Sequence, residues 1–145
     1  STKIRTALQE GDVKKANRYL GRAFSISGEV VSGERLGNTI GFPTANIKIP
    51  ESYKLTPKKG AYLVKAQMEN TDYFGMLNIG VRPTVNGVDE TIEVHFFDWD
   101  KDLYGRTLEI EFLDFLREEQ RFESVSALKA QLSQDKIKSY SLIQG

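Results

Sequence analysis

From residue 21 to residue 116 the sequence is a series of short runs rich in β-branched and aromatic residues, separated by Gly, Pro and Asn. Runs of this kind between turn-forming residues predict strands. The runs do not alternate with helical segments, as a parallel sheet would require. The pattern therefore predicts a closed or split antiparallel barrel. The clearest runs are residues 24–31, 61–68, 73–79, 91–99 and 107–116.

Two pairs of these runs predict neighbouring strands. Residues 61–68 and 73–79 flank Asn70-Thr71 and predict a hairpin. Residues 91–99 and 107–116, joined by a polar turn through residues 100–105, predict a second pair. We expect longer loops at residues 32–39, which contain glycine and charged residues, and at residues 50–60, which contain Lys58-Lys59. Residues 80–89, with Pro83 and Asn86-Gly87, predict another turn region.

The first twenty residues predict two short helices. The first ends at Gly11, and Asp12 can cap a second helix that stops at Gly21. The apolar residues before and after Gly11 recur at helical spacing.

The end of the chain predicts a further helix. Ser124 is a capping residue, and the residues that follow place an apolar stripe on one side. The helix continues or restarts at Asp135 and runs to about Leu142. The apolar residues that support this prediction are Val125, Leu128, Leu132, Ile137 and Tyr140.

Composition excludes several classes of site. The 145 residues suggest one domain, and 20 basic residues balance 20 acidic ones, so no net positive field favours nucleic acid or an anionic membrane. The chain has no cysteine and a single histidine, His95, which excludes disulfides, thiolate metal sites and multi-histidine metal sites. Any metal would need oxygen ligands, as magnesium does. The absence of cysteine, of a long apolar run and of a signal-peptide pattern fits a cytoplasmic protein.

The segment Gly37-Asn-Thr-Ile-Gly41-Phe-Pro43-Thr44-Ala-Asn46 is the most distinctive in the chain. Glycine allows a backbone to approach a ligand closely, and proline pushes the preceding residue into an extended conformation. In an extended segment Thr44 and Asn46 point to the same face. A hydroxyl and a carboxamide on one face suit a hard cation and a phosphate group. On the local pattern alone, a turn that leads into an ordinary strand is the preferred interpretation.

Glu93 stands in the middle of a strand of β-branched and aromatic residues. Alternation places Ile92, Val94 and Phe96 on one face and Thr91, Glu93, His95 and Phe97 on the other. A carboxylate is costly to bury there without a partner. Glu93 is therefore either exposed to solvent or functional.

The segment from Gly37 to Asn46 resembles the G-x-x-x-G-[FY]-P-T-A-N signature of riboflavin kinases. The resemblance extends from about Gly21 to the C-terminus. The other segments that carry it are Gly28-x-Val30-x-x-Gly33, Glu93-Val94-His95, Asp102-Leu103-Tyr104-Gly105 and Leu116-Arg117. It implies a mainly β fold, a six-stranded antiparallel Greek-key or split β-barrel with a C-terminal helix. It also implies phosphorylation of the ribityl 5′-hydroxyl of riboflavin by ATP with Mg²⁺, which gives FMN and ADP.

The resemblance implies a role for each matching residue. Glu93 corresponds to the general base, and Thr44 and Asn46 correspond to magnesium and phosphate ligands. His95 and Arg117 also have ordinary interpretations, as a strand histidine with a satisfied hydrogen bond and as a surface residue at a strand end. The positions that correspond to the ATP site are Gly33, Gly37, Asn38, Gly41, Thr44, Asn46, His95 and Asp98, and those that correspond to the flavin site are Arg117, Gln120 and Phe122. Asn38 departs from the family, which often carries Arg or Lys there, so Arg35 is the candidate loop cation.

The first residues, Ser1-Thr2-Lys3-Ile4-Arg5, resemble the end of the S-S-T-x-I-R motif in the adenylyltransferase half of bacterial bifunctional FAD synthetases. The resemblance implies that residues 1–20 are a helical connector from an N-terminal adenylyltransferase domain that this sequence lacks, and that residues 21–145 are the riboflavin kinase domain. A plain N-terminal helical pair is the alternative. Two other functions remain open, a non-catalytic flavin- or nucleotide-binding barrel and an oligonucleotide-binding barrel. The neutral charge and the acidic strand residues disfavour the second, so we expect no nucleic-acid or membrane partner.

Overall fold

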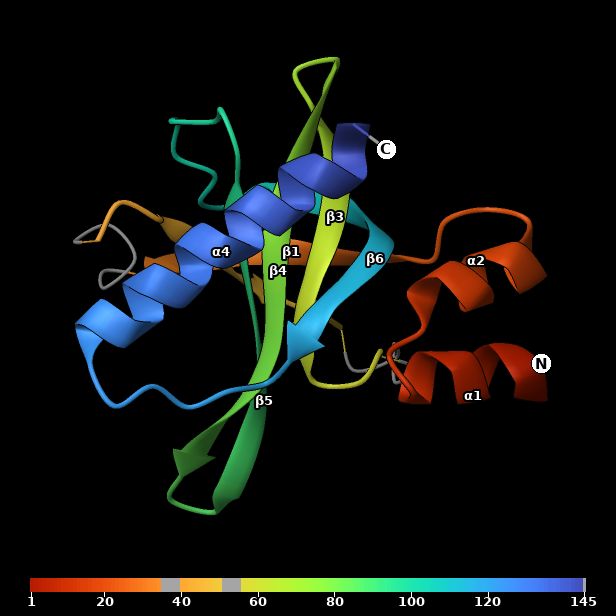
Figure 1. Cartoon of the computed structure of the whole chain (residues 1–145), viewed down its shortest axis with the longest axis horizontal. Helices are drawn as coiled ribbons and strands as arrows, with labels where there is room; N and C mark the ends of the chain where they lie inside the picture. Colours follow the sequence, from red (N-terminus) through yellow and green to blue (C-terminus); the bar gives the residue numbers. More distant parts are fainter. Residues whose placement is uncertain (35–39, 51–55, 145) are drawn as a thin grey trace.

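The computed structural model describes residues 1–34, 40–50 and 56–144. Six strands form a closed antiparallel barrel in the order β1-β2-β5-β4-β3-β6, with helices at its N- and C-terminal sides (Figure 1). This confirms the predicted fold class. The elements are α1 (Thr2–Gln9), α2 (Val13–Leu20), β1 (Ser25–Glu34), β2 (Thr44–Lys48), β3 (Gly60–Met68), β4 (Thr71–Thr84), β5 (Gly87–Phe96), β6 (Thr107–Glu118) and α4 (Val125–Gln144). Among the described helices, none has the length and apolar character that a membrane crossing requires.

The strand order corrects one predicted pair. β5 and β6, which follow each other in the chain, are not neighbours: β5 pairs with β2 and β4, whereas β6 pairs with β1 and β3. Both edges of β5 are occupied, because the hairpin before it supplies β4 and the chain from β2 supplies the other partner. The connection between β5 and β6 is therefore a crossover of the Greek-key kind and not a hairpin turn. The predicted hairpin of β3 and β4 is confirmed.

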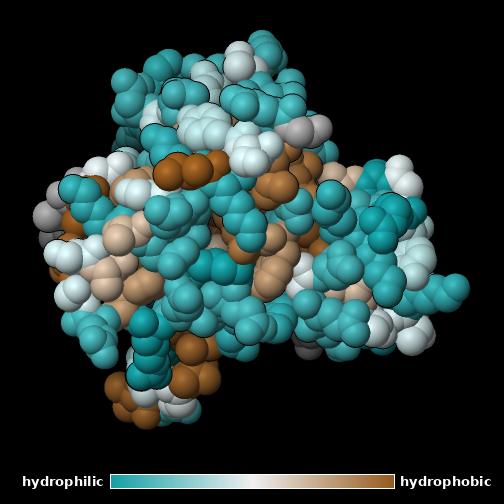
Figure 2. Space-filling model, in the orientation of Figure 1, coloured by the Kyte–Doolittle hydropathy of each residue, from teal (hydrophilic) through white to brown (hydrophobic). Residues whose placement is uncertain are grey.

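The predicted turn region at residues 80–89 is mostly strand. β4 and β5 pair from Gly75↔Phe96 to Thr84↔Gly87, so only the two residues between Thr84 and Gly87 turn. Pro83 is tolerated because the last β3 pair with β4 is Gly60↔Ile79, which leaves the outer edge of β4 without a partner strand at the proline. The hairpin projects beyond the barrel, and apolar atoms gather at its tip (Figure 2).

β1 also extends further than predicted. Residues 32–39 were expected to form a loop, but β1 continues to Glu34, which pairs with Thr44 on β2. A register shift between Val30 and Ser32 interrupts the pairing of β1 with β2. This bulge allows the strand to continue while it bends around the barrel.

The barrel interior and the N-terminal helices share one hydrophobic core. Alternate residues of each strand point inward, and Ala7, Leu8, Val13 and Ala16 of α1 and α2 are buried with them. The predicted caps are present, because the Asp12 side chain accepts a hydrogen bond from the backbone N–H of Lys15 at 3.1 Å, and α2 ends at Gly21 with φ +73°. The helical pair therefore closes one part of the barrel.

One side of the outer face of the barrel is covered by α4, which crosses in front of β3 and β4 (Figure 1). α4 is one continuous helix, and Ser124 Oγ accepts a hydrogen bond from Ala127 N–H at 3.1 Å, as its predicted capping role requires. Leu128, Leu132 and Tyr140 pack against a second apolar cluster on this face. Val125 and Ile137 are exposed, so the predicted apolar stripe is wrong at these two positions. Ile137 lies on the side of the helix opposite the buried residues Asp135 and Ser139.

Candidate active site

A row of directly paired residues crosses the outer face of the barrel. Asn46 on β2 pairs with Glu93 on β5, and Glu93 pairs with Asn78 on β4. Asn78 pairs in turn with Ala61 on β3, and Ala61 pairs with Arg117 on β6. Residues that face each other across strands point to the same side of a sheet. Five strands thus place a carboxamide, a carboxylate, a second carboxamide, a methyl group and a guanidinium in one line.

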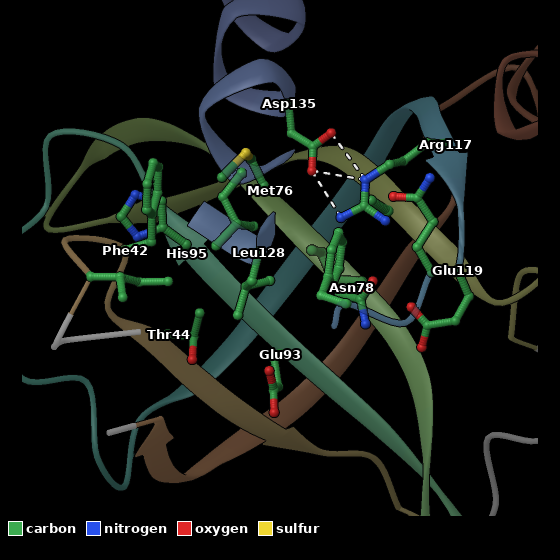
Figure 3. Close-up of a pocket in the computed structure, with 16 residues that line it drawn as sticks. Phe42, Thr44, Met76, Asn78, Glu93, His95, Arg117, Glu119, Leu128 and Asp135 are labelled. Atoms are coloured by element: carbon green, nitrogen blue, oxygen red, sulfur yellow. Dashed lines mark hydrogen bonds and ion pairs between the residues drawn. The ribbon is translucent and has the colours of Figure 1, made fainter. Parts of the chain in front are cut away.

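A cavity of about 260 Å³ lies between this row and α4. Glu93, Asn78 and Arg117 line it from the barrel, while Leu128 and Leu132 line it from the helix (Figure 3). Its volume is near the lower end of the range for small-molecule sites, and its mixture of apolar walls and a few polar groups is typical of them. The other lining residues are Ile40, Phe42, Thr44, Met76, Leu77, His95, Glu119, Gln120, Phe122, Asp135 and Ala61.

Thr44 stands at the side of this cavity nearest Glu93 (Figure 3). Its hydroxyl oxygen is buried and has no hydrogen-bond partner among the described residues. Burial of a hydroxyl group without a hydrogen-bond partner costs free energy. A bound ion or ligand that contacts the Thr44 oxygen would remove this cost. Thr44 also lines a second cavity of about 380 Å³, with Trp99, Asp102 and Tyr104. Thr44 therefore lines both cavities.

The donor set near Thr44 fits a magnesium ion carried by a phosphate ligand. Thr44 and Asn46 offer neutral oxygen atoms, and Mg²⁺ binds such oxygens while it keeps waters or phosphate oxygens in its shell. Within the described ranges, no group of three or more His, Cys, Asp or Glu side chains is arranged to hold a metal. An ion here would depend on water or phosphate oxygens for much of its coordination.

His95 is buried on the same face of β5 as Glu93, and its ring contacts the backbone of the turn before Thr44. Its Nδ1 lies 2.7 Å from the carbonyl oxygen of Pro43. A carbonyl oxygen only accepts, so Nδ1 carries the proton and Nε2 is the free acceptor. Burial is the main cause that lowers the pKa of His95, a nearby Lys136 lowers it further, and the Pro43 hydrogen bond opposes the change. The imidazole is therefore neutral at pH 7, and its ring packs edge-on against Phe42.

Arg117 joins the end of β6 to α4. Its Nε lies 3.0 and 2.9 Å from the two carboxylate oxygens of Asp135, and its second nitrogen forms an ion pair with Asp135 Oδ2 at 2.9 Å. Gln131 donates to the same carboxylate at 2.9 Å, and Lys138 donates to the carbonyl of Leu116 at 2.6 Å. The guanidinium also lies 5.6 Å from the ring centre of Phe122. These contacts fix the wall of the cavity, so Arg117 is not a free surface residue.

The structure brings half of the twelve predicted catalytic, metal, nucleotide and flavin positions to one cavity. The cavity is lined by six of them, which are Thr44, Glu93, His95, Arg117, Gln120 and Phe122. Asn46 is the direct neighbour of Glu93 but lines an adjacent cavity of about 600 Å³.

The remaining predicted positions lie apart from the cavity or outside the described residues. Gly33 pairs with Ala45, and Gly41 has φ +87° just before Phe42. Asp98 is exposed after β5, with φ +63°, and does not line the cavity. The three that fall outside the described residues are Arg35, Gly37 and Asn38.

Sequence reasoning missed Asn78, Glu119 and Asp135. Asn78 has the same signal as Glu93, a polar residue in the middle of an apolar strand on the outward face. Asp135 follows Leu128 and Leu132 at helical spacing. The sequence could therefore have predicted a carboxylate on the apolar side of this helix. Glu119 follows the last strand and had no local signal.

The family model for riboflavin kinase matches residues 20–143. The chain is 43% identical over 136 residues to the bifunctional riboflavin kinase/FMN adenylyltransferase of Haemophilus influenzae. This alignment covers 93% of this chain and 44% of that protein. It is 42% identical over 139 residues to the Bacillus subtilis protein of the same description, with 94% and 44% covered. The chain thus spans less than half the length of these relatives.

Two solved structures resemble the fold. A crystal structure of a Streptococcus pneumoniae protein described as a macrolide-efflux protein superposes with a TM-score of 0.87 at 35% identity, over 97% of this chain and 46% of that one. Riboflavin kinase from Trypanosoma brucei superposes with a TM-score of 0.55 at 24% identity, over 83% of this chain and 79% of that one. The second likeness concerns the fold alone.

Proposed function

The chain belongs to the riboflavin kinase family, and we propose that it transfers the γ-phosphoryl group of ATP to the ribityl 5′-hydroxyl of riboflavin, with Mg²⁺. The observation that carries the proposal is the placement of Glu93 and Thr44 in one cavity, with Asn46 directly opposite Glu93. A base and the ligands for a charged phosphate are then within reach of a single bound alcohol.

Glu93 acts as the general base in this proposal. As the 5′ oxygen forms its bond to the γ-phosphorus, the bond from that phosphorus to the β–γ bridging oxygen breaks, and the alcohol proton passes to the Glu93 carboxylate. A primary alcohol is a weak nucleophile at neutral pH, so a positioned base contributes about 10²- to 10⁴-fold to the rate. The remaining acceleration comes from positioning and from neutralisation of phosphate charge.

The Thr44 side of the cavity holds the phosphates. Thr44 Oγ1 and the Asn46 carboxamide would be the protein ligands of the magnesium ion, which when bound neutralises charge on the phosphate oxygens. The second cavity, which shares Thr44, is the place that we propose for the rest of the nucleotide. Gly33, Gly37, Asn38, Gly41, His95 and Asp98 remain predicted nucleotide contacts.

The far side of the cavity binds the flavin ring. Leu128 and Leu132 supply apolar surface, and Phe122 lies beside the Arg117 guanidinium. Arg117 reaches this place already paired with Asp135, so we propose that it shapes the ring site and that Gln120 and Phe122 contact the ring. Since the matched relatives are longer bifunctional proteins, we also propose that residues 1–20 connect this kinase domain to an adenylyltransferase domain.

The test is FMN production from riboflavin, ATP and Mg²⁺ by the chain and by Glu93→Gln. We expect the variant to lose about 10²- to 10⁴-fold in turnover while its affinity for ATP is kept. Glu109→Gln is the matched control, because Glu109 is an exposed carboxylate on β6, away from the cavity.

Each outcome has a clear meaning. Equal turnover by Glu93→Gln and the unchanged chain would refute the role of Glu93. A chain that binds riboflavin without FMN production would instead be a non-catalytic flavin-binding barrel.

A further inference from the structure

Asn78 occupies the central position of the row that crosses the outer face. It is half-buried, it lines the cavity, and it pairs with Glu93 on one side and with Ala61 on the other. Figure 3 shows it between Glu93 and the pair of Arg117 with Asp135. A ligand that lies along this row from the proposed base towards Arg117 would pass over this side chain.

The surroundings of Asn78 leave room for a narrow polar chain. Its neighbour in the row, Ala61, has only a methyl group, so the floor of the cavity is low between Asn78 and Arg117. Two residues further along β4, Gly80 has no side chain, and the Glu119 carboxylate fills that space. A Cβ at Gly80 would lie 2.2 Å from Glu119 Oε2 and 3.1 Å from Asn78 Nδ2, so the Asn78 and Glu119 polar groups flank the same point.

The spacing of the row matches an extended flavin. Adjacent strands lie about 4.8 Å apart, so the three steps from Glu93 to Arg117 cover about 14 Å. With the 5′-hydroxyl at Glu93 and the ring against Leu128, Leu132 and Phe122, the carbon chain between them lies over Asn78. That chain carries three secondary hydroxyl groups, and each both donates and accepts hydrogen bonds.

A carboxamide is suited to this position. It offers two donors and an acceptor oxygen, so it can bind neighbouring hydroxyls of a polyol at once. The carboxamide is also neutral. A carboxylate at this position would repel the Glu93 carboxylate, and a cation would form an ion pair with it. An asparagine therefore binds hydroxyls without changing the basicity of the proposed base.

We propose that the Asn78 carboxamide hydrogen-bonds the secondary hydroxyls of the ribityl chain and is a specificity-determining residue of the cavity, a role that rests on the proposed function. Asn78 then distinguishes riboflavin from flavins that have the same ring without the polyol. It also holds the 5′ carbon in reach of Glu93.

The experiment compares riboflavin with lumiflavin, which has the same ring and a methyl group in place of the ribityl chain. Each flavin is titrated with the unchanged chain, Asn78→Ala and Asn78→Val, and binding is followed by flavin fluorescence. The valine variant keeps strand propensity, which protects the test against a folding defect in the alanine variant. We expect riboflavin affinity to fall about 3- to 10-fold in both variants, the effect of one or two hydrogen bonds, with lumiflavin affinity unchanged.

Leu132→Ala is the contrasting control, because Leu132 lines the cavity from α4 and is apolar. It should weaken riboflavin and lumiflavin alike. In turnover assays the Asn78 variants should raise KM for riboflavin and leave KM for ATP unchanged.

Two results would overturn the proposal for Asn78: unchanged riboflavin affinity in both variants, or an equal loss for riboflavin and lumiflavin. Failure of the proposed function is distinguishable, since the unchanged chain would then neither bind riboflavin nor produce FMN.

Discussion

The barrel has helices on two sides, and they are attached in different ways. α1 and α2 contribute apolar side chains to the barrel interior, where Ala7, Leu8, Val13 and Ala16 are at most 1% exposed. α4 lies across the outer face, where Leu128 and Leu132 are only half-buried. The first contact buries these four side chains almost completely, whereas the second encloses the cavity of about 260 Å³.

Polar contacts differ between the two sides as well. At the N-terminal helices, the Asn17 side chain of α2 links two backbone segments. Its Nδ2 donates to the carbonyl oxygen of Phe112 at 2.8 Å, and its Oδ1 accepts from the N–H of Phe24 at 2.6 Å. At α4, the buried ion pair of Arg117 and Asp135 stands at the rim of the cavity. The difference indicates that the N-terminal pair stabilises the barrel, while α4 positions the wall of the cavity.

Asp135→Ala should have the largest effect on stability and should also affect the site. Arg117 and Asp135 side chains are 14% and 5% exposed, so removal of the carboxylate leaves a mostly buried guanidinium without its partner. Breaking a buried pair of this kind costs about 3–5 kcal/mol. We expect that loss in urea unfolding, together with a higher KM for riboflavin in turnover assays.

The double variant Arg117→Met with Asp135→Leu separates the two effects. Apolar replacement of both partners should recover most of the stability, because no buried charge remains. Riboflavin KM should stay high if the pair shapes the ring site. A double variant with normal riboflavin KM would show that the pair serves stability alone.

Leu8→Ala should destabilise the protein with no effect on the site. Leu8 is fully buried, and truncation of a buried leucine to alanine typically costs about 2–5 kcal/mol. The folded fraction should keep its riboflavin affinity and its KM values, because the helical pair lies in the core cluster and does not line the cavity. Flavin titration at a temperature where the variant is folded checks this, and a large rise in riboflavin KM there would contradict the contrast between the two sides.

Thr44→Val should have a smaller effect on stability, and of opposite sign. The buried Thr44 hydroxyl has no partner among the described residues, so its removal should leave the ligand-free protein equally stable or up to about 1 kcal/mol more stable. The shift in Tm that MgATP produces should shrink, because a magnesium ligand is lost. Thr107→Val, at an exposed position on β6, is the control. A variant that is less stable and retains the full MgATP shift would contradict the prediction.

Local alternation predicted much of the site. In β5 it separated Ile92, Val94 and Phe96, which enter the interior, from Glu93 and His95, which line the cavity. Both outcomes depend only on the period of two in a strand, so a single sequence was sufficient. The roles of these residues, by contrast, came from resemblance to a family and not from their pattern.

Strand order and long-range pairs were not predictable in this way. The hairpin of β3 and β4 depends on neighbouring residues, but the separation of β5 from β6 depends on which strands occupy their edges. The ion pair of Arg117 with Asp135 joins residues 18 apart through the position of α4 on the barrel. Their side chains carry no local signal of each other. The residues that each strand contributes to the cavity are thus predictable from the sequence. The position of α4, which encloses the cavity, is not.

A further prediction concerns pH and the single histidine. Burial lowers the pKa of His95 from its ordinary 6.5, so the folded state holds a proton less readily than the unfolded state. The stabilisation is complete above pH 6.5 and is lost as the pH falls through the pKa of the folded state, with a slope of at most about 1.4 kcal/mol per pH unit. The free energy of unfolding should therefore decrease on acidification below pH 6.5.

Nuclear magnetic resonance tests this directly, because one histidine gives one imidazole signal to titrate. We expect a midpoint below 6.5 in the folded protein. His95→Gln should flatten the pH dependence of stability between about pH 6.5 and the titration midpoint, since no other imidazole is present. A midpoint at or above 6.5 would mean that the Pro43 carbonyl, which favours the protonated ring, outweighs burial and Lys136. The imidazole ring of His95, on the same face of β5 as Glu93, would then be partly charged near neutral pH. The cavity would in that case be more polar on this side than the burial of His95 indicates.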